Sequence, residues 1–281
     1  MRYNTYENYT KITAISDFNL KKTFECGQCF RWNVDENGVY TGVAFGKAAK
    51  IWTEGTSICI SGREDDFLSY WRDYFDLDRD YSAIRESLCV DNYMRKATTF
   101  GAGIRILRQN KWEALCSFII SQCNNIPRIK GIVEALCREF GEPIEFDGKI
   151  YYSFPGSDTI AKLTPEQLAP IRSGFRASYI VGAAKAIEEG YLDMDALAEG
   201  SYESALKALK KLKGVGDKVA NCVILFGLNM LNAFPVDVWM KRTISEHYDK
   251  SFTPDVFGEY AGIAQQYMFY YARSGQEEIG A

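Results

Sequence analysis

The spacing of hydrophobic residues changes partway along the chain, and this change constrains the fold more than any other feature. Hydrophobic and polar residues alternate in a strand-like way from about residue 18 to 62, for example in Val39, Thr41, Val43 and Phe45. After Asp65 the period lengthens, and from about Arg95 nearly every segment favours helix. The sequence predicts an α+β fold: an N-terminal antiparallel β domain with flanking helices (residues 1–98), then a mostly helical domain (residues 99–281).

Composition narrows the class of protein. With 281 residues, 47% of them hydrophobic, the chain can bury a sizeable core. The N-terminus is polar and no apolar run reaches the length of a membrane span, so we expect a soluble intracellular protein without a membrane partner. The eight cysteines are scattered, which favours free thiols in a reducing compartment, and Cys26 and Cys29 have no second pair beside them. The single histidine, His247, argues against a His-based triad or a His-rich metal site.

The charge is unevenly distributed along the sequence. A net charge of −4 argues against a protein that coats nucleic acid without specificity. However, an acidic run precedes a stretch that is rich in cations, namely Arg95, Lys96, Arg105, Arg108, Lys111, Arg128 and Lys130. Such a stretch predicts a local basic face that could steer DNA towards the protein.

Two predicted helices, Tyr202 to Leu212 and Asp217 to Gly227, flank the short turn Gly214-Val215-Gly216. Glycines allow a sharp turn and leave backbone N–H groups uncovered at the start of the second helix, where a phosphate would be stabilised. A plain helix-helix turn has the same pattern. The spacing alone therefore leaves both interpretations open.

Residues near this turn have a spacing suited to catalysis. Lys218 lies in the first turn of the second helix, and Cys222 and Phe226 follow on the same stripe. A helix N-terminus favours the neutral, nucleophilic form of an amine. Asp237 precedes another predicted helix, Val238 to Tyr248, where it could be an N-cap, a stabiliser of developing positive charge, or both. A solvated lysine above two core residues is the simpler alternative.

The run Lys211–Cys222, followed by Pro235–Val238, resembles the signature of the helix-hairpin-helix DNA glycosylases (HhH-GPD superfamily), with the hairpin at about residues 202–227. More narrowly, the chain resembles the 8-oxoguanine DNA glycosylase/AP lyases from about Phe18 to Arg273. Further matching segments occur in the expected order, namely Gly27–Trp32, Tyr74–Asp78, Arg105–Gln109, Asn124–Ile129 and Tyr260–Gln265. The resemblance implies a bifunctional DNA repair enzyme.

This resemblance assigns the chemistry to a few residues. Lys218 would attack the anomeric carbon, expel the damaged base and form a Schiff base that can lead to strand cleavage, with Asp237 assisting. The backbone carbonyl of Gly27 would accept from N7–H of 8-oxoguanine. Undamaged guanine has a lone pair at N7, so a buried carbonyl facing it is strongly disfavoured.

The resemblance also implies how the flipped base is held. Gln265 would pair with its Watson–Crick edge, and Phe269 and Cys222 would sandwich its faces. Phe226 would belong to the same pocket. Since Gln265 and Phe269 are four residues apart, one helix face can present both.

On the opposite strand, Arg128 and Arg176 match arginines that read the orphaned cytosine, and Phe175 matches an aromatic wedge. Three positions depart from the family pattern: Cys123 stands where an asparagine is common, Phe175 replaces a tyrosine, and Trp239 replaces a histidine near the DNA backbone. We therefore expect a cytosine preference that is real but relaxed.

The remaining implied contacts lie at the hairpin. Gly214 and Gly216, with Trp239, would contact the DNA backbone, and a structural monovalent or calcium ion would be held by the main-chain carbonyls of Lys210, Leu212 and Val215. No cofactor is required. The expected partner is duplex DNA containing 8-oxoguanine, bound by a monomer located in the cytoplasm of a prokaryote or the nucleus of a eukaryote.

Three other classes of protein share parts of this pattern. Iron–sulfur glycosylases need a C-terminal cysteine quartet, and no cysteine follows Cys222, so we expect no iron–sulfur cluster. Alkyl-base glycosylases lack the hairpin lysine, so Lys218 argues against that class, while another HhH glycosylase with a different base specificity stays an alternative. A non-catalytic hairpin module that only grips the DNA backbone would need the glycines but neither Lys218 nor Asp237.

Overall fold

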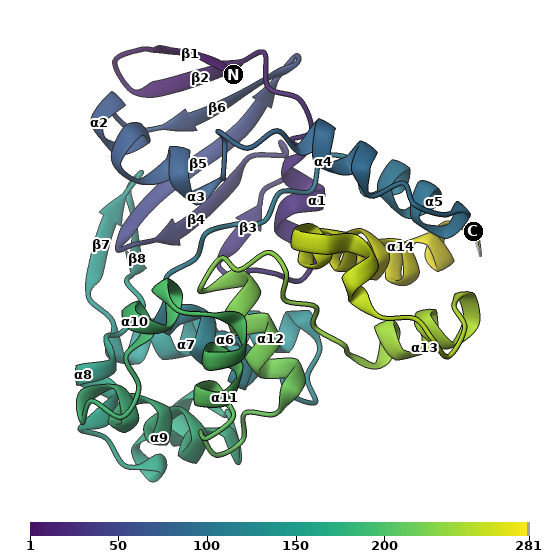
Figure 1. Cartoon of the computed structure of the whole chain (residues 1–281). Helices are drawn as coiled ribbons and strands as arrows, with labels where there is room; N and C mark the ends of the chain where they lie inside the picture. The colour runs from purple at the N-terminus through teal and green to yellow at the C-terminus, as the bar shows by residue number, and fades with distance from the viewer. Residues whose placement is uncertain (280–281) are drawn as a thin grey trace.

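A six-stranded antiparallel sheet forms the N-terminal part of the computed structural model, which describes residues 1–279 (Figure 1). Its strands are β1 (Arg2–Thr5), β2 (Tyr9–Thr13), β3 (Trp32–Val34), β4 (Tyr40–Ala44), β5 (Lys47–Glu54) and β6 (Ser57–Ser61). They lie in the order β1-β2-β6-β5-β4-β3. Glu54 pairs with Ser57 across the β5–β6 turn. The predicted sheet is therefore confirmed.

The prediction was wrong at the start of this region. The sheet begins at Arg2, and the segment Leu20–Glu25 is a helix, α1, rather than part of a strand-like stretch. Asn19 begins this helix because its side chain accepts from the backbone N–H of Lys22 at 3.0 Å. Six residues are too few to show a helical period, and β1 is too exposed to alternate clearly.

Aromatic residues fill the space beneath the sheet. The rings of Phe24 and Trp32 stack with centroids 4.6 Å apart, and Trp32 donates through Nε1 to the hydroxyl of Tyr74 at 2.8 Å. Gly42 lies directly against Trp32, where a Cβ would approach the indole to 2.3 Å. A glycine is therefore required at this point of β4. This core fixes the loop that follows α1, which carries Gly27.

The rest of the described chain is mostly helical, as predicted. It contains α2 (Glu64–Asp66), α3 (Arg72–Tyr74), α4 (Tyr81–Ser87), α5 (Asn92–Phe100), α6 (Lys111–Ile120), α7 (Ile126–Phe140), α8 (Ser157–Ala161), α9 (Arg176–Glu188), α10 (Met194–Glu199), α11 (Tyr202–Leu209), α12 (Asp217–Phe226), α13 (Val238–His247) and α14 (Ala261–Ile279). A π-helical turn and two 3-10 helices complete it at Phe67–Trp71, Pro165–Ile171 and Pro254–Tyr260. The boundary predicted at residue 98 stays a prediction.

A small hairpin inside the helical part was not predicted. Strands β7 (Pro143–Phe146) and β8 (Lys149–Tyr152) pair with each other, and β7 lies beside β5 of the large sheet. The turn residues Asp147 and Gly148 both have positive φ angles, of 52° and 69°. An Asp-Gly pair with this geometry is a hairpin signal that the sequence did contain.

Helix α14 joins the two parts of the molecule. In Figure 1 it runs beneath α1, beside α5 and above the central helices. Gly262 of α14 lies against α12, where a Cβ would come within 2.4 Å of Leu225, and its N–H donates to the Leu231 carbonyl, in the loop after α12, at 2.6 Å. Residues on α14 can therefore face both α12 and the Gly27 loop.

Three cations of the predicted basic face are engaged by other groups of the protein, and the acidic run folds back onto one of them, Arg108. Arg105 is only 2% exposed and donates to main-chain carbonyls. Arg108 forms ion pairs with Asp73 and Asp76, each at 2.9 Å, and Lys111 pairs with a carboxylate as well. These cations stabilise the fold. Within residues 1–279, no helix is long and apolar enough to cross a membrane.

Candidate active site

A deep pocket forms where the Gly27 loop, α6, α12, the loop before α13 and α14 meet. It holds about 60 Å³ and is lined by Gly27, Phe118, Lys218, Cys222, Phe226, Pro235, Asp237, Gln265, Gln266 and Phe269. All seven residues proposed from sequence for catalysis and base recognition are among them. An adjoining outer groove of about 660 Å³ shares five of these lining residues, including Lys218 and Asp237. The two residues proposed for catalysis thus stand at the junction of pocket and groove.

The hairpin between α11 and α12 places Lys218 at this junction. Gly214 has a φ of +84°, and a Cβ there would approach the ring of Tyr179 to 2.2 Å, so both backbone and packing require glycine. Gly216 is the N-cap of α12, and a Cβ at Gly216 would meet open space. Lys210 bridges the turn by an ion pair with Asp217 at 2.5 Å. The hairpin is therefore rigid, with the N-terminus of α12 accessible.

Lys218 is half-buried, and its amine is held by a residue that the sequence analysis missed. Its Nζ donates to the hydroxyl of Ser121, at the end of α6, at 3.0 Å. Ser121 in turn donates to the carbonyl of Phe118 at 2.8 Å, which directs a hydroxyl lone pair towards the amine. The amine also lies 5.6 Å from the centre of the Phe118 ring. These contacts fix the direction of the lysine.

Asp237 begins α13 as the predicted N-cap. Its Oδ1 accepts from the N–H of Met240 at 2.8 Å, while the other carboxylate oxygen has no hydrogen-bond partner in the described part of the chain. Burial raises the pKa of the Cys222 thiol to about 11, with Lys218 lowering and Asp237 raising that pKa. Both charges therefore act on the same thiol. Near neutral pH this thiol is protonated, so it offers a contact surface rather than a reactive thiolate.

Aromatic residues and a glycine form the walls of the deep pocket. Phe226 is 2% exposed and stacks on Phe118 with ring centroids 5.3 Å apart. Gly27 has a φ of +85°, and a Cβ there would lie 3.5 Å from the Phe269 ring. Arg273, another residue missed from sequence, donates to the Glu25 carbonyl at 2.6 Å and lies 5.5 Å from the Phe269 ring centre. It thereby ties α14 to the loop that carries Gly27.

The residues proposed to meet the opposite strand gather beside the outer groove. Cys123 and the half-buried Trp239 line this groove. Phe175 is 56% exposed, and the Arg176 guanidinium lies 4.3 Å from its ring centre. Arg128 is exposed nearby: burial lowers the pKa of Arg176, and the Arg128 charge lowers it further.

Arg176 itself differs from the expectation. It is 4% exposed, and its guanidinium donates to the carbonyl of Gln122 at 2.9 Å through Nε and to that of Ser173 at 3.1 Å. A third contact reaches the carbonyl of Cys123 at 3.4 Å. In this structure Arg176 holds the turn that displays Cys123, and its donor groups are turned towards the backbone.

Side-chain metal ligands, the two neighbouring cysteines and the hairpin carbonyls are the groups that bear on a metal or redox role. Among them, no cluster of three or more His, Cys, Asp or Glu side chains could hold a metal ion. Burial raises the pKa of Cys26 to about 11 and that of Cys29 well above its usual value, so neither is a reactive thiol. In the hairpin, the Leu212 carbonyl accepts from the N–H of Val215 at 3.1 Å and keeps a second lone pair.

Family models match almost the whole of this architecture. Residues 12–115 match the 8-oxoguanine DNA glycosylase N-terminal domain, and residues 116–254 match the HhH-GPD superfamily base excision DNA repair proteins. The fold and the hairpin site therefore define the class: this is a base excision DNA repair protein of the HhH-GPD superfamily.

The N-glycosylase/DNA lyase of Saccharomyces cerevisiae is 31% identical over 262 residues, covering 84% of this chain and 70% of the yeast protein. The chain belongs to the 8-oxoguanine DNA glycosylase family, and it is a bifunctional N-glycosylase/DNA lyase. A structure of MBOgg1 with a low affinity DNA ligand is 45% identical, with a TM-score of 0.93 and full coverage of both chains. The Clostridium acetobutylicum 8-oxoguanine glycosylase/lyase, bound to duplex DNA with cytosine opposite 8-oxoG, is 37% identical with a TM-score of 0.93, covering 98% of this chain and 99% of that one.

Proposed function

We propose that this protein excises 8-oxoguanine from duplex DNA and then cleaves the strand at the abasic site, with Lys218 as nucleophile and Asp237 as its electrostatic partner. The observation that carries this proposal is the convergence of both residues with Gly27, Gln265 and Phe269 on one pocket. A pocket with a base-reading amide, an aromatic face and a lysine at its entrance suits a base that has been flipped out of the duplex.

The reaction begins when the Lys218 amine attacks the anomeric carbon of the damaged nucleotide and the bond to the base breaks. Positive charge develops on the sugar as the base leaves, and the unpartnered oxygen of Asp237 is available to stabilise it. The lysine then forms a Schiff base with the opened sugar. Loss of a proton from the neighbouring carbon expels the 3′ phosphate, which breaks the strand, and hydrolysis releases the lysine.

Selection of 8-oxoguanine would depend on Gly27. Its backbone carbonyl accepts the hydrogen that N7 carries in 8-oxoguanine, whereas guanine would place a lone pair against the same oxygen. The positive φ of Gly27, a conformation that glycine adopts without strain, sets the direction of this carbonyl. Leaving a buried acceptor unpaired costs about 1–3 kcal/mol, which is enough to disfavour the undamaged base.

We propose further contacts for the rest of the duplex. The accessible N-terminus of α12, with Gly216 as its N-cap, would bind a phosphate. Carbonyl oxygens of the hairpin are hard, neutral ligands that suit a monovalent or calcium ion, and those of Lys210, Leu212 and Val215 would hold it. The enzyme would bind DNA as a monomer, and its chemistry would require no other cofactor.

Borohydride trapping tests this function. Wild-type protein is incubated with a duplex containing 8-oxoguanine opposite cytosine in the presence of borohydride, which reduces a Schiff base to a stable covalent adduct. We expect an adduct with the damaged duplex and none with the matched undamaged duplex. Free base and cleaved strand should appear when borohydride is omitted. Binding of the damaged duplex without adduct or base release would favour a non-catalytic role.

A further inference from the structure

The deep pocket contains a second glutamine that the proposed reaction does not use. Gln266 lines the pocket beside Gln265, and the two side chains are 4% and 3% exposed. The Oε1 atom of Gln266 is buried and has no hydrogen-bond partner in the described part of the chain. Leaving a buried amide oxygen unpaired is unfavourable, and such atoms are rare in folded proteins. On a residue that lines a binding pocket, an unpaired acceptor is a group whose missing donor a ligand could supply.

One hydrogen bond fixes the orientation of both amides. Nε2 of Gln266 donates to Oε1 of Gln265 at 2.9 Å. The Oε1 of Gln266 is bonded to the same carbon as this nitrogen, so it lies near the oxygen end of the Gln265 amide. The N–H groups of Gln265 have no acceptor among the described residues, and its oxygen keeps a second lone pair. The two side chains together can therefore present three groups to a base. These are the N–H groups of Gln265 as donors, then Oε1 of Gln265 and Oε1 of Gln266 as acceptors.

This order is complementary to the Watson–Crick edge of a guanine-type base. That edge presents O6 as an acceptor, then N1–H and the exocyclic 2-amino group as donors. A single glutamine amide has one donor end and one acceptor end, so it satisfies O6 and N1–H and leaves the 2-amino group without a partner. An adenine-type edge would place a donor against the N–H groups of Gln265 and would offer nothing to Gln266.

We propose that Gln266 is a specificity-determining residue whose side-chain oxygen accepts a hydrogen bond from the 2-amino group of the flipped base. This inference rests on the proposed function, since it requires a guanine-type base in the pocket. The same residue also orients Gln265 through its amide donor. Recognition of the base is thus divided between two adjacent residues of α14, one reading O6 and N1–H and the other reading the 2-amino group.

A purely structural role for Gln266 makes a different prediction. If Gln266 only positioned Gln265 or filled space, replacing it would slow excision of every base by a similar factor. If its oxygen binds the 2-amino group, the effect of replacing it depends on whether the base carries that group. The two interpretations are therefore separated by a comparison of two substrates rather than by the loss of activity itself.

The experiment measures single-turnover excision of 8-oxoguanine and of 8-oxohypoxanthine, which is the same base without the 2-amino group, each opposite cytosine. Wild type is compared with Gln266→Met, which keeps the length of the side chain without its polar atoms. We expect the preference for 8-oxoguanine over 8-oxohypoxanthine to fall by about five- to hundredfold in the variant, the range for a buried acceptor left unpaired. Differences in the intrinsic reactivity of the two bases cancel in this ratio.

Gln266→Glu separates the acceptor from the donor. The carboxyl group retains an oxygen that can accept from the 2-amino group, so this variant should keep the wild-type preference even where its absolute rate falls. Equal slowing of both bases in Gln266→Met, or loss of the preference in Gln266→Glu, would overturn the proposal. Failure of wild type to excise either base would instead refute the proposed function.

A binding measurement covers the case in which Gln266→Met does not fold. The Lys218→Gln protein, which lacks the nucleophile, is titrated with duplexes containing either base, so that the leaving group does not affect the result. We expect about five- to hundredfold tighter binding of the 8-oxoguanine duplex. Equal affinity for the two duplexes would overturn the assignment of Gln266.

Discussion

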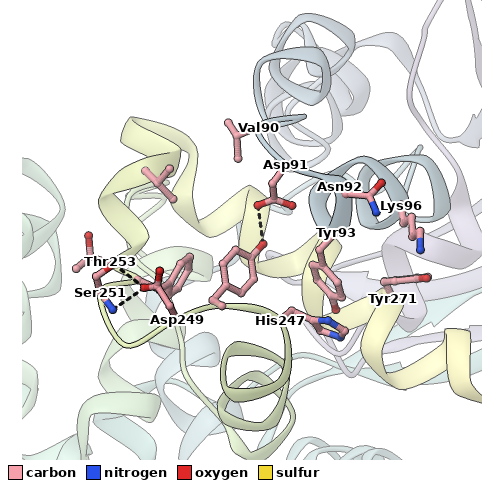
Figure 2. A pocket seen from close by; sticks show the side chains of 13 residues that line it. Val90, Asp91, Asn92, Tyr93, Lys96, His247, Asp249, Ser251, Thr253 and Tyr271 are labelled. Atoms are coloured by element: carbon pink, nitrogen blue, oxygen red, sulfur yellow. Dashed lines mark hydrogen bonds between the residues drawn. The ribbon is translucent and has the colours of Figure 1, made fainter.

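The deep pocket can be compared with a much larger cleft at the other end of α13. This large cleft lies between the N-terminus of α5, the C-terminus of α13 with the loop that follows, and α14 (Figure 2). It holds about 790 Å³, against about 60 Å³ in the deep pocket. Both contain an aspartate that caps a helix and a lysine nearby, Asp91 with Lys96 in the cleft and Asp237 with Lys218 in the pocket. Volume and residue type therefore do not distinguish them.

Hydrogen bonding does distinguish them. In the large cleft, the second oxygen of Asp91 accepts from the hydroxyl of Tyr248 at 3.0 Å, and the ring of His247 stacks on Tyr93 at 4.3 Å (Figure 2). Burial and Asp91 together raise the pKa of Tyr248, so this hydroxyl stays a donor. Lys96 is exposed. The carboxylates of the cleft therefore have partners within it, Asp91 in Tyr248 and Asp249 in Ser251.

In the deep pocket, by contrast, the second oxygen of Asp237 and the side-chain oxygen of Gln266 have no partner among the described residues. Lys218, whose amine donates to the Ser121 hydroxyl, lines the same space. Buried polar atoms of folded proteins are mostly hydrogen-bonded, so an unpaired one on a residue that lines a pocket is available to a ligand. The deep pocket therefore differs from the large cleft in its unpaired polar groups, whereas size alone would have singled out the cleft.

The largest expected effect on excision comes from replacing each of the two lysines by glutamine in a separate variant. Lys218→Gln should abolish borohydride trapping and base excision while binding of damaged duplex persists, because the nucleophile is lost and the phosphate contacts remain. Lys96→Gln, the matched change in the large cleft, should leave both activities at the wild-type level. Trapping gels and a binding titration measure these outcomes. An adduct formed by Lys218→Gln would remove Lys218 from the role of nucleophile.

The two capping aspartates give the next largest difference. Asp237→Asn and Asp91→Asn both preserve the cap, because asparagine also accepts from the backbone N–H. We expect Asp237→Asn to slow single-turnover excision by about a hundredfold or more, which is the scale for one preorganised electrostatic group. Asp91→Asn should leave the rate unchanged. Similar rates for both variants would show that Asp237 acts only as a cap.

Much of this site could be predicted because local chemistry dictates it. The glycines of the hairpin, the four-residue spacing from Lys218 to Cys222 and the cap at Asp237 depend on neighbours in the chain, and each has a recognisable pattern. Resemblance to a family then supplied Gly27, which lies far away in sequence and has no local signature of function.

The remaining contacts could not be predicted because they join distant segments. Ser121 meets Lys218 across 97 positions, and Arg273 reaches Glu25 across 248. The position of Gln266, one residue after Gln265, places it off the stripe that Gln265 shares with Phe269. The prediction of the basic face missed its ion pairs for the same reason. The positions of the cations in the sequence do not reveal that Asp73 and Asp76 fold back onto Arg108.

A smaller effect is expected in the outer groove. Cys123 has a φ of +49°, a conformation that asparagine adopts more readily than cysteine. Cys123→Asn should tighten the preference for cytosine over adenine by about three- to tenfold, the value of one neutral hydrogen bond. Cys123→Gly is the matched control, since it relieves the backbone without adding a donor. Single-turnover excision opposite each of the four bases measures the ratio. The prediction fails if both variants change it equally.

The smallest effect on catalysis is expected from Tyr248→Phe in the large cleft. The substitution removes the hydroxyl that satisfies Asp91 and leaves that carboxylate oxygen to water, since the cleft is open on this side. We expect the free energy of unfolding to fall by about 0.5–1.5 kcal/mol, the net value of one hydrogen bond, with no change in the rate of excision. Thermal unfolding and single-turnover excision on the same preparation measure the two quantities. A variant of normal stability with slower excision would reverse the comparison, because the cleft would then contribute to the reaction and its internal hydrogen bonds would no longer mark it as a structural region.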